Sequence, residues 1–319
     1  MSRVFLLHEN PEWVAPLESA LDTLAIPFEV WNIAEGALDL DTVPPFGVFY
    51  CRMSASAHTR GHHLAAEYAT ALLLWLERHE RPVVNGSRSV LVETSKVRQY
   101  MALTEAGLRV PPTRVAVGAA QVRAAAAGLG YPLIVKPNRG GKGLGVQKFD
   151  SEQALMDYVT GDAFDAGPDG TVLVQKYIQP EAPYIIRNEF VAGRHLYSVR
   201  VDTQNGFELC PAEACAIGDL ACPIGEGENQ FDILPDFEAP EIARYERLLA
   251  SENIDIAGIE MIRGDDGLTY TYDINVNTNY NPDAEARALG PHRPGGMLSV
   301  ATYLGELLQR ANVPVTRSA

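Results

Sequence analysis

The chain has 319 residues, of which 46% are hydrophobic and 21% charged, a composition typical of a globular protein with one large or two ordinary domains. Its 26 basic and 41 acidic residues give a net charge of −15, which argues against a nucleic-acid or anionic-membrane partner, because both favour a basic surface. No apolar run approaches the roughly 20 residues of a membrane helix. The four cysteines form no CxxC pair, so we expect reduced thiols, no zinc site and a cytoplasmic location.

The first third of the chain alternates strand and helix patterns. Strands are expected at residues 4–7, 28–31, 47–50 and 82–84, and helices at residues 12–24 and 63–78. This alternation predicts a small parallel α/β domain. The turn-forming run Asn85-Gly86-Ser87 predicts the domain boundary, which divides the chain into residues 1–86 and 87–319.

The second region begins with a predicted helix at residues 95–106, which Gly107 ends. Further strands are expected at 132–136, 145–149, 171–176, 185–191, 195–201, 256–262 and 268–274, and helices at 119–127, 151–159, 240–250 and 296–311. Asp150 is the expected N-cap of the helix at 151–159. The two strands that flank Gly193 predict an antiparallel hairpin. Residues 206–237 show little periodicity, which predicts an active-site loop or a partner-contacting insertion.

The strongest local signal is a glycine-rich loop between two predicted strands, the first of which ends at Lys136. The loop contains Gly140, Gly141, Lys142, Gly143 and Gly145. Glycine lets backbone N–H groups approach phosphate oxygens, and lysine neutralises the phosphate charge. The loop lacks the Ser or Thr and the following helix of a P-loop, and the strand–helix context of a dinucleotide-binding fingerprint. On its own, an ordinary glycine-rich hairpin turn explains the segment equally well.

Two acidic residues and an asparagine lie in apolar strand contexts far downstream. Asp273 and Asn275 are two residues apart, so both project from one face of a strand, and Glu260 comes from a neighbouring strand. Two carboxylates and an amide oxygen would form a hard site suited to Mg²⁺ bound together with phosphates. The alternative interpretation is a solvated acidic strand face.

Two weaker patterns occur elsewhere in the chain. The apolar strand at 171–176 runs into a polar segment up to Glu181, which is compatible with an adenine-binding hinge or with an ordinary strand end. In the first domain, Arg52, His58 and Arg60 follow a strand whose carboxyl end would face a ligand crevice, and they could bind an acidic substrate. A plain polar loop is the alternative, and a metal site is disfavoured because no carboxylate or cysteine completes the set.

Two arginines lie on the predicted hairpin, thirteen residues apart. Arg187 is on its first strand and Arg200 on its second. A guanidinium donates two parallel hydrogen bonds to a planar carboxylate or to a phosphate. The alternative for each is a surface arginine on a strand.

In this order and spacing, the segments resemble the ATP-grasp superfamily over about residues 90–310, and in particular the RimK-like alpha-L-glutamate ligase branch of carboxylate–amine ligases. The resemblance implies an α/β protein with an ATP-grasp fold, in which two α+β subdomains grip ATP, preceded by a small parallel α/β pre-ATP-grasp domain. The lid-bearing subdomain would span about 112–177 and the C-terminal subdomain about 178–319. That branch more often has Asp at the position of Glu260 and Glu at that of Asp273, and it usually has Glu at the position of Gln175. These departures leave the identity of the substrate undetermined.

The resemblance also implies roles for single residues. The implied catalytic residues are Arg200, aimed at the transferred phosphate, and Lys142. The implied ATP-binding residues are Lys96, Lys136, Gly140, Gly141, Gly143, Gln175, Lys176, Tyr177, Ile178 and Glu181. The implied ligands of one or two Mg²⁺ ions are Glu260, Asp273 and Asn275. The candidate substrate-binding residues are Arg187, Asn277, Arg52, His58 and Arg60.

The implied reaction joins a small-molecule or peptide carboxylate to an amine, such as an amino acid, through an acyl phosphate, and releases ADP and phosphate. Two alternatives stay open: another ATP-grasp phosphotransferase, and a regulatory module that binds ATP without turnover. The complete acidic set favours turnover, because a module that only senses ATP has less need of a full metal site. The substrates, the preference for Mg²⁺ over Mn²⁺, and a homo-oligomeric state are not determined by the sequence.

Overall fold

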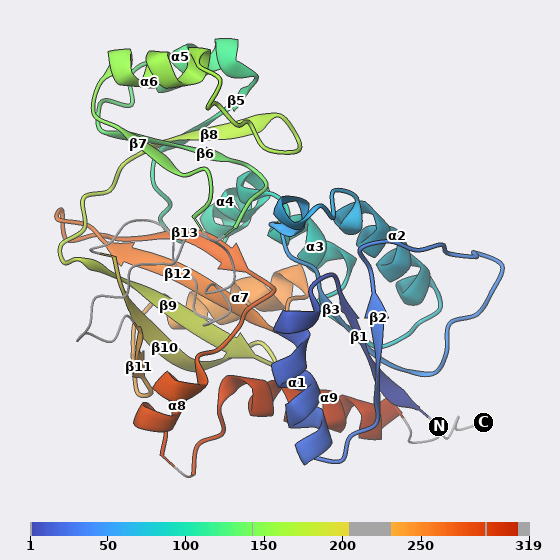
Figure 1. Ribbon diagram of the computed structural model, residues 1–319. Helices are drawn as coiled ribbons and strands as arrows, with labels where there is room; N and C mark the ends of the chain where they lie inside the picture. The colour runs from blue at the N-terminus through green and yellow to red at the C-terminus, as the bar shows by residue number, and fades with distance from the viewer. Residues whose placement is uncertain (1, 142, 204–230, 291, 312–319) are drawn as a thin grey trace.

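Three β-sheets and their covering helices make up the part of the chain that the structure describes (Figure 1). The structure is a computed structural model, and the described residues are 2–141, 143–203, 231–290 and 292–311. Lys142 and most of the aperiodic stretch at 206–237, including its three cysteines, lie outside these ranges.

The first sheet is parallel and has the strand order β2-β1-β3-β4, which confirms the parallel α/β prediction. Its elements are β1 (Arg3–His8), α1 (Pro11–Thr23), β2 (Phe28–Asn32), β3 (Gly47–Arg52), the 3-10 turn η1 (Ala57–Arg60), α2 (Ala65–Arg78) and β4 (Val83–Val84). Alternate residues face opposite sides, so that Leu6 and Tyr50 pack with α1 whereas Leu7 and Cys51 pack with α2. The buried Cys51 is a free thiol.

The second sheet is antiparallel, with the order β5-β8-β6-β7. Its elements are β5 (Thr113–Val117), the 3-10 turn η2 (Ala119–Gln121), α5 (Val122–Ala126), β6 (Leu133–Pro137), β7 (Gln147–Phe149), α6 (Glu152–Thr160) and β8 (Thr171–Lys176). Helices α5 and α6 cover one face of this sheet, at the top of Figure 1. Val122 and Leu155 from these helices pack against Val135 and Val172 and form a core separate from the others.

Two sequence predictions for the second sheet are corrected. Strand β5 was not predicted, because it is an edge strand in which only Ala116 is buried, and so it lacks an apolar pattern. The N-cap of α6 is Ser151 and not Asp150: Ser151 Oγ accepts a hydrogen bond from the backbone N–H of Ala154 at 3.2 Å. Asp150 is instead paired with Lys148 at 2.9 Å.

The third sheet is antiparallel, with the order β11-β10-β9-β12-β13, and it contains the predicted hairpin. Its elements are β9 (Tyr184–Val191), β10 (Arg194–Asp202), β11 (Phe231–Leu234), α7 (Ile242–Glu252), β12 (Ala257–Arg263), β13 (Thr269–Asn275), α8 (Pro282–Ala288) and α9 (Gly296–Ala311). Helix α7 packs on one face through Tyr245 and Leu249. Strand β11 and helix α8 were absent from the sequence prediction.

Two short helices, α3 (Ser87–Glu93) and α4 (Lys96–Glu105), connect the first sheet to the rest of the molecule. Helix α3 was not predicted and begins directly after the predicted boundary at residue 86. Helix α4 confirms the prediction, and Gly107 follows it in the left-handed region at φ 73°. No helix in the described ranges is long and apolar enough to cross a membrane.

Candidate active site

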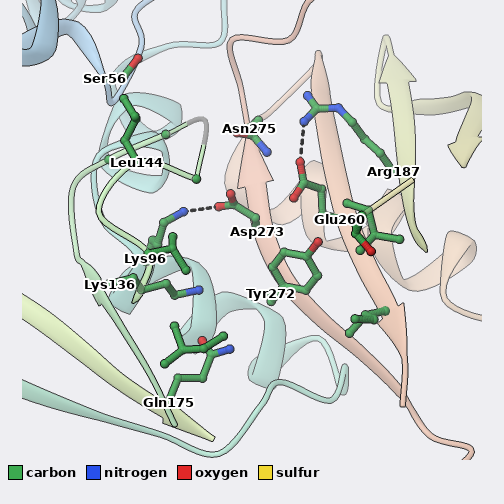
Figure 2. A pocket seen from close by; sticks show the side chains of 18 of the residues that line it. Ser56, Lys96, Lys136, Leu144, Gln175, Arg187, Glu260, Tyr272, Asp273 and Asn275 are labelled. Carbon is green, nitrogen blue, oxygen red and sulfur yellow. Dashed lines mark hydrogen bonds and ion pairs between the residues drawn. The ribbon is translucent and has the colours of Figure 1, made fainter. Parts of the chain in front are cut away.

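A cavity of about 380 Å³ is lined by residues of the second and third sheets, of helices α1, α3 and α4, and of the segment that follows β3 (Figure 2). It brings together most of the site residues that the sequence analysis selected. Those in its lining are Lys96, Lys136, Gly140, Gly141, Gly143, Gln175, Tyr177, Ile178, Arg187, Glu260, Asp273, Asn275 and Asn277. Segments more than 100 residues apart in sequence therefore share one site.

The acidic side of the cavity is formed by two neighbouring strands. Glu260 on β12 lies directly opposite Asp273 on β13, so both carboxylates belong to one face of the sheet, as the sequence analysis expected. Lys96, at the start of α4, donates to Asp273 Oδ1 at 2.5 Å (Figure 2). Burial raises the pKa of Glu260, and the nearby Arg187 opposes that shift.

Arg187 is buried in the cavity wall and bound on three sides. Its Nε donates to Glu189 at 2.6 Å, and its two terminal nitrogens donate to Glu260 and to the Thr278 hydroxyl, each at 2.8 Å. Burial lowers the pKa of Arg187, but the two carboxylates outweigh it, so the net direction is upward. The guanidinium is thus held charged and in one orientation beside the acidic pair.

Lys136 lies across the cavity from these acids and has a different environment. Its Nζ donates to the Tyr100 hydroxyl at 2.8 Å, and that hydroxyl donates to Gln175 Oε1 at 2.6 Å. Among the described residues, no carboxylate forms an ion pair with Lys136. Burial, together with the positive charge of Lys96, lowers the pKa of Lys136 to about 7.

The glycine-rich loop covers one side of the cavity. Gly143 and Gly145 lie at φ 75° and 74°, in the left-handed region that a side chain disfavours. A Cβ at Gly141 would lie 3.6 Å from Ser56 Cβ, so the loop reaches the first domain. Lys142, the predicted catalytic lysine, falls outside the described residues.

Arg200, the other predicted catalytic residue, is not brought into the cavity. On β10 it stands opposite Ile186 of β9, whereas Arg187 stands opposite Val199. Because adjacent residues of a strand point to opposite faces, Arg200 lies on the face away from Arg187. It is exposed and forms an ion pair with Asp232 of β11.

Two predicted nucleotide-binding side chains also lie outside the cavity lining. Lys176 Nζ donates to the carbonyls of Gly130 and Tyr131, each at 3.0 Å. Glu181 is paired with Arg263 at 2.6 Å on the surface. Neither side chain therefore reaches the cavity in this arrangement.

The cationic residues predicted to bind an acidic substrate are engaged elsewhere. Arg52 is buried and donates to Thr278 O at 3.1 Å and to Asn279 Oδ1 at 2.7 Å. His58 Nδ1 donates to Ala55 O at 3.1 Å. Arg60 is paired with the buried Glu9, so its charge is already compensated. None of the three lines the cavity.

The first domain instead contributes Trp13, Ser54 and Ser56 to the cavity. The two serines follow β3 directly, so the rule that ligands bind at the carboxyl ends of parallel strands points to their segment. The rule does not distinguish them from the neighbouring arginine. Trp13 lies on α1, and nothing in the sequence distinguishes it from an ordinary core residue of that helix.

The donor set at β12 and β13 fits Mg²⁺ bound together with phosphates. No group of three or more His, Cys, Asp or Glu suited to a metal occurs in the described ranges, so two carboxylates and an amide would need further oxygens. A triphosphate supplies such oxygens. Within the described part of the chain, the buried Nδ2 of Asn275 has no hydrogen-bond partner, and this donor suits an acceptor such as a phosphate oxygen.

Comparison with solved structures shows that the chain has the ATP-grasp fold. It is similar over almost its whole length to a RimK domain protein of ATP-grasp type from Sphaerobacter thermophilus DSM 20745, with a TM-score of 0.65 and 19% identity, covering 96% of this chain and 99% of that chain. The D-cycloserine synthetase DcsG is similar with a TM-score of 0.65 and 17% identity, covering 96% and 99%. The ATP-grasp ligase PsnB, in complex with a minimal precursor, gives 0.65 and 15%, covering 95% and 98%.

Sequence comparison finds shorter matches. The family model described as D-ala D-ala ligase C-terminus matches residues 97–185. Biotin carboxylase 2 of Bacillus subtilis (strain 168) is 31% identical over 113 residues, which is 34% of this chain. The match spans 25% of the length of that carboxylase. The family-model match includes the glycine-rich loop and strands β6 and β8, which contribute Lys136 and Gln175 to the cavity.

Proposed function

We propose that the chain is an ADP-forming ATP-grasp ligase that joins a carboxylate to an amine. One observation carries this proposal: Lys96 and Asp273 meet at 2.5 Å in a cavity that a glycine-rich loop covers. Cationic side chains suited to a triphosphate and acidic side chains suited to its metal ion therefore line the same cavity. The similarity to RimK-domain, D-cycloserine and PsnB ATP-grasp proteins supports the same class of chemistry.

The cavity offers ATP an apolar end and a charged end. Ile134, Tyr177 and Ile178 line the apolar end, where adenine would lie. Lys96 and Lys136 would neutralise the phosphates, and backbone N–H groups of the glycine-rich loop would bind their oxygens. Lys142 keeps its predicted role in that loop.

Glu260, Asp273 and Asn275 are the residues that would hold one or two Mg²⁺ ions. The ion supplies further neutralisation of the triphosphate charge when bound. A structure of the ligase PsnB contains Mg and ADP, which supports this assignment for the fold.

In the proposed reaction, a carboxylate oxygen of the first substrate attacks the γ-phosphorus, and the bond from that phosphorus to ADP breaks. The amine nitrogen then attacks the acyl carbon, phosphate leaves with the carboxylate oxygen, and the nitrogen loses a proton. Catalysis of this kind depends on positioning and charge neutralisation. We assign to Arg187 the role that the sequence suggested for Arg200, because each terminal nitrogen keeps a second N–H for a carboxylate or phosphate.

The substrates are proposed only by class. DcsG is named for a small product and PsnB was solved with a precursor peptide, so similar folds serve small molecules and peptides. We infer a small-molecule or peptide carboxylate and an amine for this chain. The division into residues 1–86 and 87–319 and the cytoplasmic location remain predictions.

Labelling of the substrate carboxylate with heavy oxygen tests the reaction. Carboxylates and amino acids are first screened for ADP release, and the active carboxylate is then labelled. We expect label in inorganic phosphate, ADP as the nucleotide product, and product formation that requires the amine. Asp273→Asn should reduce turnover by about 100-fold or more while the protein stays folded.

Other outcomes would contradict the proposal in distinct ways. Label in AMP would indicate an adenylate intermediate. Phosphate transfer without an amine requirement would indicate a phosphotransferase. ATP binding without turnover for any acceptor would indicate a regulatory module.

A further inference from the structure

Strand β13, which carries Asp273 and Asn275, is an edge strand of the third sheet. Within the described ranges, no further strand pairs with its outer side, where the backbone groups of Ile274 and Val276 need other partners. Gln99 supplies them for Ile274: its Oε1 accepts from the N–H at 3.0 Å, and its Nε2 donates to the carbonyl at 2.8 Å.

Two more side chains complete this edge at Val276. Glu93 accepts from the Val276 N–H at 2.8 Å, and Asn85 Nδ2 donates to the Val276 carbonyl at 2.9 Å. Glu93, Asn85 and Gln99 are all buried. Side chains from the α3–α4 region thus replace a neighbouring strand beside the proposed metal ligands.

Of these three side chains, Glu93 is the one that also binds the segment after β3. Its Oε1 accepts from the backbone N–H of Ala55 at 2.9 Å, while its Oε2 holds Val276. Ala55 lies between Ser54 and Ser56, which line the cavity. We call residues 54–56 the serine wall. One carboxylate therefore joins the serine wall of the first domain to the strand of the metal ligands.

The chemistry of the side chain matters for this link. A carboxylate has two oxygens and accepts a hydrogen bond at each, whereas a glutamine of the same shape offers one oxygen and one NH₂ group. Replacement by glutamine would place an N–H donor against a backbone N–H at one end. The link therefore requires the acid, although burial raises the pKa of Glu93 and so disfavours its charge.

We propose that Glu93 is a positioning residue that couples the serine wall to the metal-binding strand. Mg²⁺ and nucleotide bound at Asp273 and Asn275 would then order the serine wall through Glu93. The serine wall follows β3 of the first sheet, whereas β13 belongs to the third sheet, and ligation requires the groups they position to be held within a fraction of an ångström. The inference takes the cavity as the nucleotide site and in that respect rests on the proposed function.

Amide hydrogen exchange with a non-hydrolysable ATP analogue and Mg²⁺ tests the coupling. In the wild type, the analogue should slow exchange in the glycine-rich loop, at Val276 and also at Ala55. In Glu93→Gln without nucleotide, exchange at Ala55 and Val276 should rise together, by about tenfold or more. With the analogue, this variant should retain protection of the loop and lose protection of Ala55.

Asn85→Asp is the matched control. It removes the donors to the carbonyls of Val276 and Ile256 and leaves the link to Ala55 intact. The strand end should loosen in this variant, but the analogue should still protect Ala55. A purely structural role of Glu93 would give the two variants the same response.

Three results would overturn the proposal. In the wild type, the analogue could protect the glycine-rich loop and leave Ala55 unprotected. In Glu93→Gln, the analogue could still protect Ala55, or the nucleotide-free variant could show unchanged exchange at Ala55 and Val276. If Glu93→Gln does not fold, Glu93→Asp keeps the charge but is too short to hold both partners, and the same results are expected. If the analogue does not protect the glycine-rich loop of the wild type, the proposed function is contradicted. Exchange at Ala55 and Val276 in the nucleotide-free wild type and Glu93→Gln would still test the link through Glu93.

Discussion

Two buried lysines approach the proposed phosphate region, and their partners set them apart. Lys96 is paired with Asp273 at 2.5 Å, whereas Lys136 has the Tyr100 hydroxyl at 2.8 Å. A hydroxyl compensates a buried charge far less than a carboxylate does. Lys136 is therefore the group whose charge depends on the presence of a triphosphate.

We predict that nucleotide binding takes up a proton at Lys136. Its pKa of about 7 in the free protein should rise in the complex, because phosphates favour the charged amine. Below pH 7 the lysine is already charged. Above pH 7 binding must also protonate it, so affinity should fall by up to about tenfold per pH unit.

Calorimetric titration with the Mg²⁺-bound analogue, in buffers of different ionisation enthalpy, measures this uptake at pH 8. Lys136→Met is the control and should bind more weakly, with no contribution of this proton. Equal proton uptake by the wild type and the variant would show that another group titrates.

The two hairpin arginines give a matched pair of variants. Arg200→Ala should change turnover by no more than about threefold, because Arg200 is exposed and lies on the other face of the sheet. Arg187→Lys keeps the charge but loses the planar fork, and should reduce turnover by about 100-fold. Turnover and melting temperature are measured for both. A large loss in Arg200→Ala with an unchanged melting temperature would return the catalytic role to Arg200.

At the scale of elements, the end of the β13 edge at Ile274 and Val276 is satisfied by side chains and not by a neighbouring strand. Gln99 satisfies both backbone groups of Ile274 and also donates to Val92 O at 3.0 Å. This arrangement keeps a strand with functional side chains at the edge of a sheet without an open hydrogen-bonding surface.

Gln99→Leu should therefore lower the free energy of unfolding by about 2–4 kcal/mol, because it leaves buried donors and acceptors unpaired. Denaturant unfolding measures the change. Gln153→Leu is the control: Gln153 is exposed on α6, where its Nε2 donates to Asp157 Oδ1 at 2.7 Å, so a change within about 0.5 kcal/mol is expected. Equal stability of the two variants would contradict the importance of the edge bonds.

At the scale of the whole molecule, helix α9 packs into a core that the first and third sheets share. Helix α9 lies beside α1 under the first sheet (Figure 1), and its buried Leu304 belongs to one core with Leu6 and Tyr50 of the first sheet and Tyr197 of the third. The second sheet has its own core, which includes Leu155. The first and third sheets should accordingly unfold together.

Leu304→Ala tests this expectation. It should cost about 2–5 kcal/mol and destabilise the first and third sheets in one transition. Leu155→Ala, with an equally buried leucine in the second sheet, should weaken mainly that sheet. Hydrogen exchange resolved by segment distinguishes the two. Separate loss of the first sheet in Leu304→Ala would contradict a shared core.

The sequence by itself determined the features that depend on neighbouring residues. Apolar periodicity located most helices and strands, including α9 and the β9–β10 hairpin. The glycine-rich loop and the spacing of Asp273 and Asn275 also indicated two segments whose residues line the cavity. These signals are local, because a helix, a strand face or a glycine turn is encoded within a few residues.

Only the tertiary structure decided which distant groups meet. The register of β9 and β10 placed Arg187 in the cavity and Arg200 outside it, and sequence spacing does not contain that register. Glu9 neutralises Arg60 from another segment, and Glu93 joins two walls through backbone N–H groups. Such contacts leave no pattern in sequence, because a backbone partner has no side-chain identity and an ion pair can join any two elements that the fold brings together.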